Sequence, residues 1–329
     1  MKIIKAWMSL AMSATMGLYA YAGLTKFGDV TVDYGSASTN WVGGELVLTY
    51  TTSSSLEISN GVVNADILVV GGGGGGGGGY SSNYGGSGGG GGKVEASELS
   101  VFCGELEISV GVGGNGGASG KAGAKGVESS VSGDGFKEVV AAGGAAGAAG
   151  KNGKPSAGVG ASGSGMTGVM SGITGYTYGV GGAAGDANAP GSPAANTGNG
   201  GKGGMKNSTA NKCTGGDGGS GVVVVRLTDA YKNTSVTLRD LTLGVGEEIV
   251  DFAEQTTGAA VDIIYSEVVS TSFNPEDVAR GERTKEGRFA LVGLSSGETT
   301  VTIVVRDEQE KTQTTYTTKA VVTPSIPLK

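Results

Sequence analysis

Hydrophobic and polar residues alternate with a period of two in the first part of the chain. The stretches DVTVDY (29–34) and GELVLTY (44–50) keep this alternation, which is typical of half-buried β-strands. The stretch ADILVV (65–70) is instead an unbroken apolar run, as expected for a strand that is covered on both faces. The pattern therefore predicts an all-β segment from about residue 27 to residue 70.

Glycine dominates the next part of the chain. Of the 68 glycines, 54 lie between residues 71 and 221, and nine of them are consecutive at 71–79. Such tracts cannot form an α-helix, because each glycine costs roughly 1 kcal/mol relative to alanine there. Two strand-like blocks interrupt the tracts, at 93–112 and 136–142, and the run VVVV (222–225) predicts a buried closing strand.

Two conformations are open to the glycine tracts. Segments rich in glycine and serine often behave as flexible linkers, an alternative that applies most to residues 143–212. Collagen is excluded because no fixed Gly-X-Y period runs through the region. The other conformation is a lattice of extended helices of the polyproline II type, in which backbone N–H and C=O groups pair between neighbouring helices. We expect this polyglycine II lattice to replace a hydrophobic core, with the order of 143–212 left open.

The composition changes again at about residue 229, where glycine becomes rare and charged residues become common. Short strand-like blocks separated by polar turns predict a β-sandwich of about seven strands. The blocks are TSVTLRDLTL, EEIVDF, AVDIIYS, GRFALVGL, TTVTIVVRD and QTTYTTKAVVT. The segment resembles the disulfide-free Ig-like modules of bacterial surface proteins, and this resemblance implies a spacer role.

The beginning of the chain has the pattern of a secretory signal peptide. Lys2 and Lys5 precede an apolar stretch at 6–18, and small residues follow up to Ala22. The apolar run of ~13 residues is shorter than the ~20 that a membrane span requires. We therefore expect a signal peptide at 1–22, a glycine-rich β domain at 23–228 and an Ig-like domain at 229–329. No membrane span is expected after cleavage.

The charged and catalytic residue types argue against an enzyme. The formal net charge is -7, which disfavours nucleic acid as a partner. The chain has no histidine, so the GGSGG sequence around Ser87 lacks the base of a hydrolase triad, and the common zinc sites are missing as well. The strand that runs into the glycines at 71–79 resembles a nucleotide-binding turn, but no helix can follow it. We expect no nucleotide, no cofactor and no metal.

Six residues remain as candidates for recognition or for a covalent link. Tyr80 and Tyr84 lie in the first glycine tract, and Tyr176 and Tyr178 lie in TGYTYG. Exposed aromatic rings there would suit contact with a sugar or a protein; the alternative is that the rings cap the glycine layer as hydrophobic patches. Cys103 and Cys213 form a disulfide in one interpretation of the secreted context and stay separate buried thiols in the other.

The order of the blocks resembles the glycine-rich domain of phage tail-fibre tip adhesins and of bacterial secreted surface proteins. The blocks are ADILVV before glycine, VGVGGNGG, EVVAAGG and the closing GGDGGSGVVVVRL, and together they span about residues 41–227. The resemblance implies glycine-rich loops that recognise a surface receptor. The signal peptide and the C-terminal domain favour a cell's own surface protein. We expect a secreted or cell-surface adhesion module that binds a surface glycan or a protein receptor; the alternative is a purely structural component of an extracellular matrix or coat.

Overall fold

The computed structural model describes residues 23–80, 84–150, 158, 160, 166–185, 191–205 and 213–324. Residues 1–22, where the signal peptide is expected, lie outside these ranges. The described part of the chain is all-β, with a single short 3-10 turn, so the expected fold class is confirmed. The chain divides into two compact units, one made mainly of residues up to Asp229 and one mainly of Ala230–Lys329.

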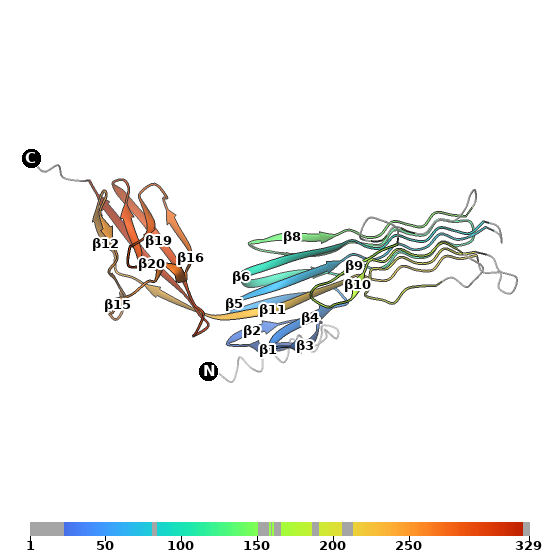
Figure 1. Cartoon of the computed structure of the whole chain (residues 1–329), viewed down its shortest axis with the longest axis horizontal. Helices are drawn as coiled ribbons and strands as arrows, with labels where there is room; N and C mark the ends of the chain where they lie inside the picture. Colours follow the sequence, from blue (N-terminus) through green and yellow to red (C-terminus); the bar gives the residue numbers. More distant parts are fainter. Residues whose placement is uncertain are drawn as a thin grey trace, which may run out of the picture. The chain divides into compact units, whose positions relative to one another are not determined.

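The first unit, called here the glycine-rich unit, contains strands β1 to β10 and the first part of β11 (Figure 1). Its sheet has the order β3-β4-β11-β5-β6-β7-β8, and β2 pairs with β5 and with β1. The strands are β1 (Leu24–Phe27), β2 (Val30–Asp33), β3 (Ser38–Val42), β4 (Glu45–Tyr50), β5 (Ser54–Val70), β6 (Val94–Ser109), β7 (Ser129–Gly133), β8 (Phe136–Ala141), β9 (Val169–Met170), β10 (Thr177–Tyr178) and β11 (Val222–Thr237).

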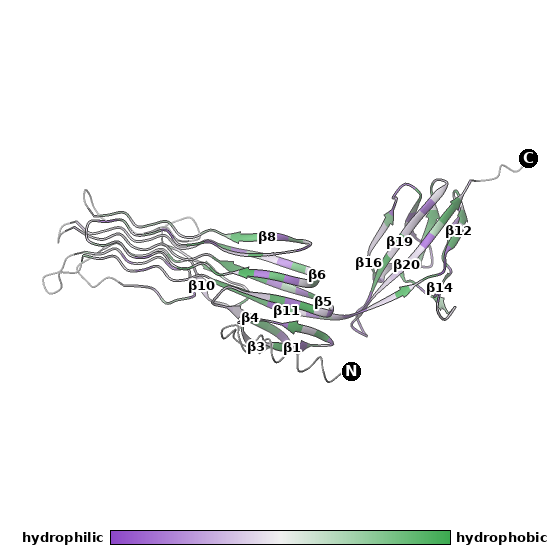
Figure 2. Ribbon diagram, turned by 180° about the vertical axis from the view of Figure 1, so that it is seen from behind, coloured by the Kyte–Doolittle hydropathy of each residue, from purple (hydrophilic) through white to green (hydrophobic). Residues whose placement is uncertain are grey.

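Burial along these strands follows the sequence pattern. In β4 the side chains alternate between buried and partly buried, as the alternation in GELVLTY predicts. The apolar run at the end of β5 is different, because Ile67–Val70 are all buried. Leu68 and Val70, which share one face of this run, pack against Tyr178 of β10. Hydrophobic residues accordingly concentrate on the strands (Figure 2).

Beyond Val70 the chain continues as a fully buried extended helix, Gly71–Gly79, called here the central polyglycine helix. All nine of its N–H groups donate hydrogen bonds of 2.7–2.9 Å to other segments. Every third residue uses the same segment, which is the signature of a helix with three residues per turn. The acceptors lie in 87–93 for Gly71, Gly74 and Gly77, in 121–127 for Gly72, Gly75 and Gly78, and in 213–219 for Gly73, Gly76 and Gly79.

Three further segments donate to the central helix with the same period, over distances of 2.8–3.0 Å. These bonds use the carbonyls of Gly72–Gly79. The three donor segments and the three acceptor segments together surround the central helix with six neighbours. The donors are Gly144, Gly147 and Gly150 in one segment, Gly114, Gly117 and Gly120 in the second, and Gly201 and Gly204 in the third. The expected polyglycine II lattice is therefore present in the described glycine tracts, including residues 144–150, 179–185 and 198–204.

The second unit has two sheets around one core. In the first, β16 (Val268–Asn274), β19 (Gly297–Asp307) and β20 (Thr312–Thr323) pair in that order, and β20 also pairs in parallel with β12 (Leu241–Gly244) and the end of β11. The other sheet is β13 (Glu248–Ile249), β18 (Phe289–Gly293) and β17 (Ala279–Arg283). β14 (Phe252–Ala253) pairs with β15 (Ala260–Val261), and the 3-10 turn is η1 (Tyr265–Glu267).

Side chains from both sheets form one buried core in this unit. Phe289 and Leu291 of β18 lie in the same cluster as Val301 and Ile303 of β19. The unit is therefore a two-sheet sandwich. Its Ig-like relationship stays a prediction.

Candidate functional site

Tyr80 and Tyr84 lie at the end of the central polyglycine helix that is remote from the sheet. The amide of Tyr80 donates to the carbonyl of Tyr84 at 2.9 Å, which closes the connection between two segments of the lattice. Their side chains are 64% and 43% exposed, so both rings face solvent. Gly150 and the carbonyl of Cys213 pair with neighbouring Gly79, so two other segments of the lattice reach this point. This remote end of the lattice is called here the tip.

Tyr176 and Tyr178 lie far from the tip, in the β9–β10 hairpin. Tyr178 packs against Leu68 and Val70 of β5. Nine residues at about 3.1 Å each separate Gly71 from Tyr80, so the two tyrosine pairs are roughly 28 Å apart along the lattice. The four tyrosines therefore do not form one site.

Tyr178 differs from the other three tyrosines because it is buried. Its ring is only 7% exposed, and its hydroxyl donates to Thr174 Oγ1 at 3.1 Å. The alternative interpretation, a hydrophobic cap, describes Tyr178, because the outer face of β5 and β11 is apolar at this point and needs a cover. Tyr176 is 71% exposed and keeps the expected solvent-facing position.

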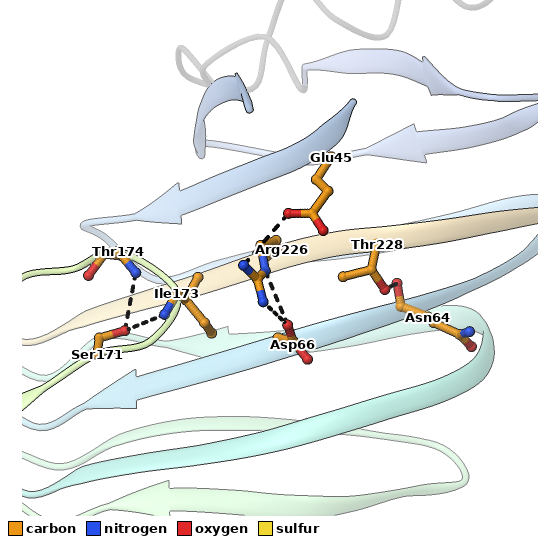
Figure 3. A network of polar contacts seen from close by, with 8 residues as sticks. All are labelled: Glu45, Asn64, Asp66, Ser171, Ile173, Thr174, Arg226 and Thr228. Carbon is orange, nitrogen blue, oxygen red and sulfur yellow. Dashed lines mark hydrogen bonds and ion pairs between the residues drawn. The ribbon is translucent and has the colours of Figure 1, made fainter. Parts of the chain in front are cut away.

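The turn of the hairpin is fixed by Ser171. Its Oγ accepts hydrogen bonds from the amides of Ile173 and Thr174, at 3.1 and 3.3 Å (Figure 3). Its amide donates to the carbonyl of Tyr176, and Gly175 adopts a φ of 72°, which favours glycine. These contacts fix the conformation of the turn.

A groove opens between this turn and strands β5, β6 and β11. Arg226 of β11 crosses it and donates from Nε to Asp66 Oδ2 at 3.1 Å, with a second, shorter bond from Nη2 (Figure 3). Glu45 of β4 lies 3.6 Å from Arg226 Nη1. The hydrogen bond with Asp66 raises the pKa of the Arg226 guanidinium, with Coulomb attraction from both carboxylates adding to the effect. Sequence reasoning missed this cluster because its three residues are far apart in the chain and belong to no motif.

The two cysteines are free thiols in the structure, which agrees with the interpretation as separate thiols and not with the disulfide. Cys103 follows Phe102, which lies opposite Val63, whereas the carbonyl of Cys213 accepts from Gly79 at the tip. The chain from Val63 to Gly79 is extended, so the two sites are about 50 Å apart at ~3.1–3.3 Å per residue. A disulfide requires Cα atoms within about 7 Å. Cys213 is buried, as the alternative of separate thiols expects, but Cys103 is exposed.

Residues 49–228 match a family model described as a glycine-rich domain. The chain belongs to this glycine-rich domain family. The match runs from Thr49 in β4 to Thr228 in β11, and it includes the whole lattice and the hairpin. The glycine-rich part of the resemblance seen in the sequence is thereby confirmed. A search among curated proteins finds no match for the chain.

In the described ranges, no group of three or more cysteine, aspartate or glutamate side chains is arranged to hold a metal ion. None of the helical segments in the described part of the chain is long and apolar enough to cross a membrane.

Proposed function

We propose that the chain is a secreted or cell-surface recognition module that presents the tip to a surface glycan or a protein receptor. The observation that carries the proposal is the exposure of Tyr80 and Tyr84 at the end of a lattice whose center is held by backbone hydrogen bonds. Large exposed aromatic rings suit contact with sugars and proteins, because they offer apolar area at little cost in side-chain entropy.

The lattice supports this role by fixing the tip. Gly79 donates to Cys213, accepts from Gly120 and forms a bridge with Gly150, so the residue before Tyr80 is held from three sides. A preorganised binding surface loses less entropy on binding than a flexible one. The resemblance to tail-fibre tip adhesins likewise implies that glycine-rich loops contact the receptor. The second unit would then act as an Ig-like spacer.

A structural role in a matrix or coat is the second candidate. The outward positions of the segment at 144–150 carry Ala145 and Ala148, both exposed, between buried glycines. Small side chains of this kind let neighbouring molecules approach closely. This role needs no specific ligand.

Binding measurements separate the two candidates. The full chain is applied to a panel of glycans and surface extracts, and the recognition role predicts saturable binding. Replacing Tyr80 and Tyr84 by serine abolishes that binding, whereas Tyr176→Ser, which removes a ring that is at least as exposed but lies far from the tip, leaves it unchanged. Hydrogen exchange of the glycine tracts confirms that the lattice is intact in each variant. Binding that survives the double substitution, or no saturable binding at all, leaves the structural role.

Cell fractionation tests the location. We expect the protein outside the cell, with an intact mass that corresponds to cleavage between Ala22 and Gly23. A mass that still includes residues 1–22 contradicts the proposed secretion by a cleaved signal peptide.

A further inference from the structure

The groove beside the β9–β10 hairpin has the size of a small-molecule site. Its volume is about 610 Å³, and small-molecule sites commonly enclose ~300–1,000 Å³. It lies on the outer face of β5, β6 and β11, and the hairpin residues Val169–Ile173 close one side. The groove belongs to the sheet end of the glycine-rich unit, and it is separate from the tip.

The register of β5 and β6 sets the character of the floor. Val70 lies opposite Val94, Leu68 opposite Ala96, and Asp66 opposite Glu98. Because residues two apart share one face of a sheet, these three pairs form a row that changes from apolar to acidic. The small side chain of Ala96 leaves space above the floor.

The hairpin supplies an apolar wall to this row. Met170 is 73% exposed and lines the groove together with Ile173, whose side chain packs on the core beneath it. An exposed methionine beside a groove is an adaptable apolar contact. The groove therefore combines an aliphatic wall with one charged end.

The charged end carries more carboxylates than cations. Arg226 is already hydrogen bonded to Asp66 and lies close to Glu45. The exposed carboxylate of Glu98 has no hydrogen bond or ion pair with any residue in the described ranges. Asp66 and Glu98 are direct cross-strand neighbours, and like charges in that position are destabilising. A cation between them would relieve the repulsion.

We propose that this groove binds a small organic cation, a primary ammonium group on a short aliphatic chain. The ammonium group lies between the carboxylates of Asp66 and Glu98, and the aliphatic chain lies over Ala96 against Met170. An anion is disfavoured because Arg226 is already paired with carboxylates. This proposal does not depend on the role of the tip.

A matched series of ligands tests the charge. Pentylammonium, pentan-1-ol and pentanoate have the same carbon chain, and each is titrated into the full chain by calorimetry. We expect pentylammonium to bind at least about tenfold more tightly than pentan-1-ol, since an ammonium–carboxylate contact is a charge-assisted hydrogen bond. We expect no binding of pentanoate and a weaker ammonium affinity at high salt.

Three variants test the place. Glu98→Gln weakens pentylammonium binding about tenfold and leaves pentan-1-ol unchanged. Glu95→Gln is the control, because Glu95 is an exposed carboxylate on the same strand but does not line the groove. Ala96→Leu fills the groove and abolishes binding of both ligands without changing any charge.

A second measurement needs no ligand. If Asp66 and Glu98 repel each other, Glu98→Gln raises the melting temperature of the free protein relative to Glu95→Gln. Equal affinity for pentylammonium and pentan-1-ol would overturn the proposal, as would a pentylammonium affinity that Glu98→Gln or Ala96→Leu leaves unchanged, or no binding of pentylammonium.

Discussion

Replacing Gly75 by alanine is the most direct test of the central polyglycine helix. Gly75 is buried, and its φ is not in the left-handed region, so the backbone itself accepts alanine. The obstacle is space. An added Cβ would lie 2.1 Å from the carbonyl oxygen of Asn115 and 2.7 Å from that of Gly114. Contacts below 3.0 Å are essentially never seen for a real Cβ, and both obstacles are backbone atoms.

The size of the effect follows from the bonds that must break. To make room, segment 114–120 has to move away from the central helix by about 1 Å. That segment donates three hydrogen bonds to the helix, from Gly114, Gly117 and Gly120. Each is worth about 1 kcal/mol net, and a buried group left unpaired costs more. We therefore expect Gly75→Ala to lower the free energy of unfolding by roughly 3 kcal/mol or more.

The control is Gly172→Ala in the hairpin turn. An added Cβ at Gly172 meets nothing within 4 Å, and its φ is not positive. Both substitutions reduce the entropy of the unfolded chain equally, by about 0.4–1 kcal/mol. The difference between the two variants in urea unfolding therefore reports the clash alone, and hydrogen exchange locates it. A difference below about 0.5 kcal/mol would refute the close backbone packing around Gly75.

The other predictions concern single side chains. Tyr178→Ala removes a buried ring and should cost about 3 kcal/mol or more, whereas Tyr176→Ala should change stability by less than about 0.5 kcal/mol; urea unfolding measures both. In the second unit, hydrogen bonds from a lysine and then from a tyrosine hydroxyl hold the pKa of Glu308 below its usual range. Glu308 therefore stabilises the folded protein at pH values above its unfolded pKa. This stabilisation is lost as the pH falls through the lowered folded pKa, and Glu308→Gln should reduce the loss in acid titrations. Thiol labelling should modify Cys103 in the native protein and Cys213 only after unfolding, with two thiols per unreduced chain; the absence of any reactive thiol after unfolding would reveal a disulfide and contradict the structure.

The strands could be predicted from the sequence because their burial has a local cause. The alternation in GELVLTY reappears as the alternating burial of β4, and the apolar run ADILVV as the doubly covered end of β5. The type of packing in the lattice could also be predicted, because the backbone groups of a glycine tract between buried strands need hydrogen-bond partners. Strand β7 was missed, because SSVSG has too few apolar residues for a periodic signal.

The position of the candidate sites could not be predicted in the same way. The distance between Cys103 and Cys213 depends on how far the glycine tract extends before it turns, and composition does not contain that length. The burial of Tyr178 depends on Leu68 and Val222, which are far from it in the chain. The groove depends on the cross-strand register that brings Asp66 opposite Glu98. All three features depend on the relative positions of residues far apart in the chain, which cannot be derived from a single sequence.

The spacing of the glycines nevertheless reflects the lattice, although no collagen period is present. The segment at 144–150 contacts the central helix with every third residue, so Gly144, Gly147 and Gly150 must lack a side chain there, and Ala145 and Ala148 face outward. The central helix has neighbours on all sides, so each of its residues meets a backbone, and nine consecutive glycines are required. A continuous glycine run is thus required where a segment is enclosed on all sides, and at 144–150 a three-residue glycine spacing is enough because the other positions face outward. No single period spans the region, because each segment starts its own register where the chain turns.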